Sequence, residues 1–137
     1  MNTRQVWVLA GGNGVGKSTF YQVALAPKGV KLVNADTIAK IINPERPEAV
    51  SYQAAGIAEK IRTALLRQGA SFCFETVFSH PSKIDFIAAA LPLVDEARLL
   101  DNSLGDDPFR QVAIVRKGVC VWAAEPLSAW VRRILPP

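Results

Sequence analysis

The chain has 137 residues, of which 50% are hydrophobic and 20% charged, and its formal net charge is +4. This length and composition favour one soluble domain, residues 1–137, built around a single hydrophobic core. No segment reaches the roughly 18 apolar residues that a membrane span needs, and the first residues do not form a secretory leader. We therefore expect a cytoplasmic protein with no membrane partner. The scattered basic residues argue against nucleic acid as a partner.

The first half of the chain alternates short apolar runs with helical patterns. The expected strands are residues 5–10, 30–36 and 70–78, and the expected helices are residues 16–25, 35–42 and 51–68. Apolar positions in the last of these helices recur at the spacing of a helix that packs one face on a sheet. Strands that alternate with helices predict a parallel sheet with right-handed crossovers.

The second half predicts one more helix and strand before the pattern changes. A helix is expected at residues 81–94, a fourth strand at 97–103, a β-hairpin at 110–125 around Lys117-Gly118, and a short helix at 126–135. Alternating apolar residues on both sides of a two-residue turn are typical of a hairpin. Trp7, Trp122 and Trp130 fall in apolar segments, so we expect them to pack in the core.

The stretch "GGNGVGKS" between the first expected strand and helix is the most specific motif. Its spacing matches G-x-x-x-x-G-K-[ST], in which backbone N–H groups, the lysine and the helix N-terminus surround phosphate oxygens and the hydroxyl ligates Mg²⁺. Together with the expected strands and helices, this motif predicts an α/β fold: a P-loop NTPase-like parallel sheet flanked by helices, with a C-terminal β-hairpin and a short helix. The residues expected to contact a nucleotide triphosphate are Gly11, Gly12, Asn13, Gly14, Val15, Gly16, Lys17, Ser18 and Thr19.

Two carboxylates follow expected strands and are the candidates for chemistry. Asp36 comes just after the second strand, and Glu75 lies at the end of the third. The carboxyl ends of parallel strands form one ligand crevice, so both should face the phosphate loop. One could accept a proton from a hydroxyl group, and the other could hold Mg²⁺ directly or through water. The alternatives are a helix N-cap for Asp36 and a surface position for Glu75.

Four segments, in the same order along the chain, resemble the zeta-toxin family of P-loop kinases. They are "WVLAGGNGVGKSTF", "LVNADTIAKIINPERPEA", "SFCFETVFS" and "LPLVDEARLLDNS". The resemblance implies an enzyme that uses ATP and Mg²⁺ to phosphorylate a nucleotide sugar, UDP-N-acetylglucosamine. It also implies a toxin–antitoxin system, with an antitoxin protein as partner.

The resemblance assigns roles to particular residues. Lys17 and Ser18 would hold ATP and Mg²⁺, and Asp36 would be the general base on the sugar hydroxyl. Asn34, Glu75 and Thr76 would line the substrate side, with Glu75 also facing the metal. Lys17, Asp36 and Glu75 are thus the expected catalytic residues.

One departure from the family pattern lies in the middle of the chain. After "FETVFSHPSKIDFI" the family continues through a further core strand and a helical lid whose arginines reach the ATP phosphates, whereas here Arg67 is followed by no arginine until Arg98. Loss of such a charge clamp predicts weaker catalysis, by about 10³-fold in related phosphoryl transfers. Arg98 and Arg110 are the candidates to replace it. The missing strand predicts either an unpaired sheet edge or the 97–103 strand in its place.

Two other functions are compatible with the same motifs. The chain could bind ATP without turnover, as a degenerate module that contacts another protein. It could also phosphorylate a different hydroxyl group.

Overall fold

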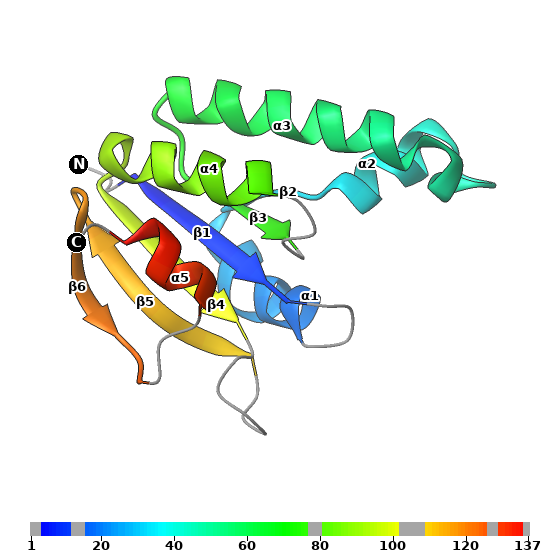
Figure 1. Ribbon diagram of the computed structural model, residues 1–137. Coiled ribbons are helices and arrows are strands. Elements are labelled where there is room, and N and C mark those ends of the chain that lie inside the picture. The colour runs from blue at the N-terminus through cyan, green and yellow to red at the C-terminus, as the bar shows by residue number, and fades with distance from the viewer. Residues whose placement is uncertain (1–3, 12–15, 77–80, 102–108, 126–128, 136–137) are drawn as a thin grey trace.

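A six-stranded sheet forms the centre of the protein, with helices on both faces (Figure 1). This computed structural model describes residues 4–11, 16–76, 81–101, 109–125 and 129–135. The strands are β1 (Gln5–Ala10), β2 (Lys31–Val33), β3 (Phe72–Thr76), β4 (Glu96–Asp101), β5 (Arg110–Arg116) and β6 (Val119–Ala123). The helices are α1 (Lys17–Phe20), α2 (Ala35–Ile42), α3 (Ser51–Arg67), α4 (Pro81–Ala90) and α5 (Ala129–Ile134). None of these helices combines the length and apolarity that a membrane crossing would need.

The sheet has the order β2-β3-β1-β4-β5-β6. The first four strands in this order are parallel, and β5 and β6 then extend the sheet by antiparallel pairing. Strand β1 is therefore central, and β4 pairs directly with it, from Gln5 opposite Glu96 to Leu9 opposite Leu100. The strand expected at residues 97–103 is thus present as β4 and lies beside β1 within the parallel part of the sheet. The carboxyl ends of β1, β2 and β3 lie at one edge of the sheet.

Alternating side chains of the parallel strands enter two hydrophobic cores, one on each face. Val6 and Val8 of β1 pack in the core beneath α3, α4 and α5, whereas Trp7 and Leu9 pack against the segment that includes α1. Burial on both faces explains why these strands appear in the sequence as continuous apolar runs. Figure 1 shows α4 and α5 on one face of the sheet and α1 on the other.

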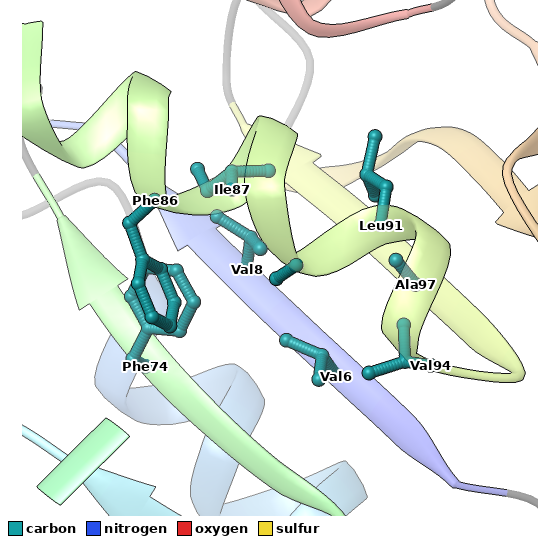
Figure 2. Close-up of a pocket in the computed structure, with 9 residues that line it drawn as sticks. Val6, Val8, Phe74, Phe86, Ile87, Leu91, Val94 and Ala97 are labelled. Carbon is teal, nitrogen blue, oxygen red and sulfur yellow. The ribbon is translucent and has the colours of Figure 1, made fainter. Parts of the chain in front are cut away.

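The core beneath α4 contains one small apolar gap. Figure 2 shows Phe74 and Phe86 at one end of this gap and Val94 and Ala97 toward the other. The two phenylalanine rings meet edge to face, with their centroids 5.6 Å apart. The volume of the gap, about 10 Å³, leaves room for at most one water molecule, and an apolar wall offers water no hydrogen bonds. The gap is therefore a packing feature of the core and not a ligand site.

The element pattern expected from the sequence is largely confirmed. The α/β class, the parallel core strands, the hairpin at Lys117-Gly118 and the final helix are all present. At the hairpin turn both residues have positive φ, 49° for Lys117 and 79° for Gly118, as a two-residue turn with the right twist requires. The second strand is shorter than predicted, since it covers only Lys31–Val33. The prediction for Trp122 is wrong: it lies on edge strand β6 with 45% of its surface exposed.

A buried carboxylate ties together the start of β1, β4 and the end of β5. Glu96 is 5% exposed. Its carboxylate accepts hydrogen bonds from Gln5 Nε2 at 2.8 Å, Arg98 Nε at 2.6 Å and Arg116 Nε at 2.8 Å. Burial alone would raise the pKa of Glu96, but these hydrogen bonds outweigh it and lower the pKa to about 2. A buried charge that is satisfied in this way stabilises the strand order.

Glu96→Gln is expected to lower the free energy of unfolding by about 2 kcal/mol at pH 7, because two guanidinium groups lose their carboxylate. The folded pKa lies below the unfolded value of about 4.3, so this contribution is present above that pH and is lost as the pH falls toward 2. Urea unfolding of both proteins from pH 7 to pH 3 measures the effect. Glu45→Gln, at an exposed position, is the matched control, and equal stability of Glu96→Gln and wild type at pH 7 would contradict the assignment.

Candidate functional site

Gly11 and Gly16, the described glycines between β1 and α1, both have positive φ, a conformation that favours glycine. Gly11 donates its N–H to the carbonyl of Thr76 at 3.0 Å, which joins the end of β1 to the end of β3. Gly16 has φ of 102°, and a Cβ atom there would lie 3.3 Å from the Cβ of Phe109. A larger residue at position 16 would therefore be strained in both backbone and packing. Gly12, Asn13, Gly14 and Val15 lie outside the described residues, so their predicted phosphate contacts stay predictions.

Lys17 is the first residue of α1, and it is buried with 8% of its surface exposed. Its Nζ donates a hydrogen bond of 2.6 Å to the carbonyl of Gly11. The side chain therefore lies back across the loop, from the helix N-terminus to the end of β1. Ser18 and Thr19 follow on the exposed side of the same turn.

Asn34 connects the second and third strands of the site. Its Oδ1 accepts the N–H of Asp36 at 2.8 Å and so caps α2, while its Nδ2 donates to Glu75 Oε2 at 3.0 Å. The N-cap of α2 is thus Asn34, and the alternative of Asp36 as the cap is wrong. Asp36 lies in the first turn of α2 with an exposed side chain, where the helix dipole favours a negative charge.

These residues line one cavity of about 430 Å³. This volume is in the range of small-molecule sites in proteins. Its walls come from the phosphate loop and α1, from α2 with its cap, and from the end of β3. The lining residues are Gly16, Lys17, Ser18, Thr19, Asn34, Asp36, Thr37, Lys40 and Glu75. The structure therefore brings together the lysine, the hydroxyls and both carboxylates that the sequence predicts for the site.

Glu75 is electrostatically coupled to the other charged groups of this cavity. Burial raises the pKa of its carboxyl group above the usual value, Lys17 opposes the shift, and Asp36 adds to it. Within the part of the chain that the structure describes, Oε1 of Glu75 is buried without a hydrogen-bond partner, while Oε2 accepts from Asn34. Glu75 is therefore half-buried in the cavity wall and not a simple surface residue.

Glu75→Gln is expected to stabilise the folded chain at neutral pH by about 0.5 kcal/mol. The folded pKa lies above the unfolded value, so ionisation of Glu75 lowers stability as the pH rises above about 4.3. Glutamine removes that loss and can still accept the Asn34 hydrogen bond. Thermal unfolding should show a higher Tm for the variant at pH 7.5 and little difference at pH 4. Glu59→Gln, exposed on α3, is the control, and a lower Tm of Glu75→Gln at pH 7.5 would contradict this reasoning.

The donor set of the cavity fits a magnesium ion held together with a nucleotide. Mg²⁺ prefers oxygen ligands and is usually bound by one or two carboxylates together with substrate phosphates. Ser18 supplies a hydroxyl, and Glu75 supplies a carboxylate whose buried Oε1 has no hydrogen-bond partner among the described residues. Among the described residues no cluster of three or more His, Cys, Asp or Glu side chains forms a dedicated metal cage, so the phosphates would have to complete the coordination.

Three other residues were singled out in the sequence: Arg98, Arg110 and Thr76. Arg98 donates to Glu96 and to Gln111 and lies 5.4 Å from the ring of Trp7, so it is held on the sheet and does not line the cavity. The backbone of Arg110 pairs with Asp101, and nothing is described of its side chain. Thr76 is buried, with 4% exposed. Its carbonyl accepts the Gly11 N–H, and its predicted substrate contact stays a prediction.

Sequence reasoning missed two residues of the cavity, Thr37 and Lys40. Both follow Asp36 on α2, at the spacings i+1 and i+4. Residues four apart lie on one face of a helix. The helical pattern that starts at Asp36 therefore contained the signal for Lys40.

The fold and this cavity define the class of the protein: an α/β protein with a P-loop NTPase-like sheet, flanked by helices and extended by a C-terminal hairpin. Among solved structures, the chain is similar to a crystal structure described as that of a "putative kinase" from Chloroflexus aurantiacus J-10-fl, with a TM-score of 0.54 and 17% sequence identity. The match covers 69% of this chain and 56% of that one, so the chain spans little more than half of its neighbour's length. At this identity the likeness shows the fold.

Comparisons of the sequence itself find no such relative. No protein-family model matches the chain, and no curated protein is significantly similar to it. The functional conclusion therefore depends on the geometry of the cavity.

Proposed function

We propose that the chain is an ATP-dependent kinase that transfers the γ-phosphoryl group to a sugar hydroxyl of a nucleotide sugar, with UDP-N-acetylglucosamine as the first acceptor to test. The observation that carries the proposal is that Lys17, Asp36 and Glu75 line one cavity at the carboxyl edge of the sheet. The kinase-like fold of the structural neighbour supports the reaction class. The choice of acceptor rests on the resemblance of the segments around Asn34 and Glu75 to zeta-toxin kinases.

In the proposed reaction Asp36 accepts the proton of the acceptor hydroxyl group while the oxygen of that hydroxyl group forms a bond to the γ-phosphorus. The bond between that phosphorus and the β,γ-bridging oxygen breaks, and ADP leaves with the electron pair. Lys17 exchanges the Gly11 carbonyl for phosphate oxygens and opposes the charge that develops on them. Glu75 and Ser18 would hold Mg²⁺, and the bound ion would supply positive charge to the phosphates.

The proposal includes a biological role as a toxin that consumes a cell-wall precursor, with an antitoxin protein as its inhibitor. This part rests on the family resemblance alone. Its test is growth of bacterial cells that express the chain. Arrest with wild type but not with Lys17→Ala is the supporting result, and growth unaffected by the wild type contradicts the toxin role.

The experiment that tests the kinase is mass spectrometry of nucleotide sugars incubated with the purified chain, ATP and Mg²⁺. The expected result is a product heavier than UDP-N-acetylglucosamine by one phosphoryl group, which does not form when EDTA removes the metal. An unchanged nucleotide sugar after long incubation contradicts this acceptor. A phosphorylated product from another hydroxyl compound in the same screen would keep the reaction class and change the substrate.

A second candidate is a module that binds ATP without transferring phosphate. The observation in its favour is that the described cavity lining contains two lysines and no arginine, since Arg98 is bound to Glu96 on the sheet. A ligand at a free concentration 100 times its Kd stabilises the folded protein by about 2.7 kcal/mol. A higher Tm with ATP but no product with any acceptor would favour this candidate over the kinase.

A further inference from the structure

Lys40 is the second lysine of the cavity, and its side chain has no carboxylate partner in the part of the chain that the structure describes. It is exposed on α2 and lines the cavity. None of the ion pairs among the described residues involves Lys40 or Asp36. Its ammonium group is thus available to an anion in the cavity.

The position of Lys40 along α2 is fixed by the helix geometry. Asn34 caps the helix next to Glu75, Asp36 lies in the first turn, and Lys40 follows four residues later on the same face. At a rise of about 1.5 Å per residue, Lys40 is about 6 Å farther along the helix axis than Asp36. It lies on the side of Asp36 away from the contact between Asn34 and Glu75.

The two lysines of the cavity differ in their surroundings. Lys17 is buried, belongs to the phosphate loop, and is bonded to the Gly11 carbonyl. Lys40 is exposed, belongs to α2, and has no bond within the described chain. Its position suits a group at the acceptor end of the cavity, because it shares the helix face of Asp36.

We propose that Lys40 is a specificity-determining residue, which binds a phosphate group of the acceptor about one helical turn from the hydroxyl that Asp36 deprotonates. This inference rests on the proposed kinase function. A lysine binds phosphate as a compact point charge with three donors. The competing structural role is an ion pair with Asp36 at i,i+4, which contributes only a few tenths of a kcal/mol on an exposed helix.

The test measures acceptor binding without turnover. Isothermal titration of UDP-N-acetylglucosamine and of N-acetylglucosamine is carried out on protein saturated with Mg²⁺ and a non-hydrolysable ATP analogue, so that neither probe enters the ATP site. Wild type is expected to bind the nucleotide sugar more tightly than the neutral sugar. Lys40→Gln should weaken binding of the nucleotide sugar 10- to 100-fold, the range for a hydrogen bond to a charged group, and leave the neutral sugar unchanged.

Two further variants separate the charge from other effects. Lys40→Arg should retain most of the affinity, because it keeps the charge, and Lys60→Gln on the exposed face of α3 should bind as wild type does. All variants should unfold within about 1 °C of wild type, since surface substitutions change stability little.

The outcomes distinguish this inference from the kinase proposal. Equal affinity of Lys40→Gln and wild type for UDP-N-acetylglucosamine, weaker binding of the ATP analogue to Lys40→Gln, or no binding of UDP-N-acetylglucosamine to the saturated wild type would each overturn it. Failure of the kinase proposal appears instead in the separate turnover assay, as absence of any phosphorylated product while both probes still bind.

Discussion

Lys17→Ala is expected to abolish the rise in Tm that ATP produces and to reduce phosphoryl transfer by at least about 10²-fold. Lys17 is the first residue of α1, and its ammonium group donates a hydrogen bond to the Gly11 carbonyl at the end of β1. In wild type, ATP at 100 times its Kd should raise the Tm by about 8 °C for a domain of this size. Differential scanning fluorimetry with and without ATP measures the first effect, and the mass-spectrometric assay measures the second.

The control for Lys17→Ala is Lys60→Ala, which removes an exposed lysine from α3. It should keep both the ATP-dependent Tm shift and the activity. The Tm of Lys17→Ala without ATP should stay close to that of wild type, because the variant loses one hydrogen bond but also removes a buried charge. If Lys17→Ala retained the full ATP shift, the cavity would not be the nucleotide site.

Asp36→Asn is expected to reduce kcat by 10²- to 10⁴-fold, the usual contribution of a general base, without loss of ATP binding. Asparagine keeps the shape and the backbone contact to Asn34, but it cannot accept the hydroxyl proton. Because Asp36 also adds to the raised pKa of Glu75, the variant should bring that pKa closer to its usual value. The measurements are kcat with saturating acceptor and the ATP-dependent Tm shift.

Asp85→Asn, at an exposed position of α4 outside the cavity lining, is the matched control and should have wild-type kcat. A kcat for Asp36→Asn within threefold of wild type would exclude Asp36 as the base. Loss of ATP binding in the same variant would instead place Asp36 on the nucleotide side of the cavity.

The fold could be predicted because local and global signals agree in most segments. Consecutive residues of β1 are apolar and point alternately to the two faces of the sheet. Each face is covered by a hydrophobic core, which explains the continuous apolar run. The hairpin turn could be placed because Lys117-Gly118 meets the demand for positive φ. Trp122 was misplaced because an edge strand with few neighbours leaves a large apolar side chain exposed, and sequence alone does not show which strand is at the edge.

The sequence predicted most of the residues that form the candidate site, but not the hydrogen bonds between them. The motif spacing located Lys17, and strand ends located Asp36 and Glu75 at one edge of the sheet. The double role of Asn34, as cap of α2 and as donor to Glu75, depends on the pairing of β2 with β3 and on side-chain geometry that the sequence does not specify.

The role of Arg98 could not be predicted from the sequence. One of its partners, Gln111, is distant in the sequence, and nothing in the sequence indicated that the other, Glu96, is buried. The register between β4 and β5 brings Gln111 to Arg98, whereas Glu96 lies two residues before Arg98 on the same strand. Arg98, which the sequence offers as a replacement for the missing lid arginines, thus forms hydrogen bonds within the sheet instead.

The hydrogen bond from Lys17 to the carbonyl of Gly11 has a consequence for the rate and strength of anion capture. A free lysine side chain loses up to about 2 kcal/mol of conformational entropy when it becomes fixed. Here folding has already restricted the four-carbon side chain of Lys17. An arriving polyphosphate therefore only has to replace the Gly11 carbonyl oxygen with a phosphate oxygen as the hydrogen-bond acceptor. Most of the ordering that a flexible cation would undergo at encounter is complete before the ligand arrives.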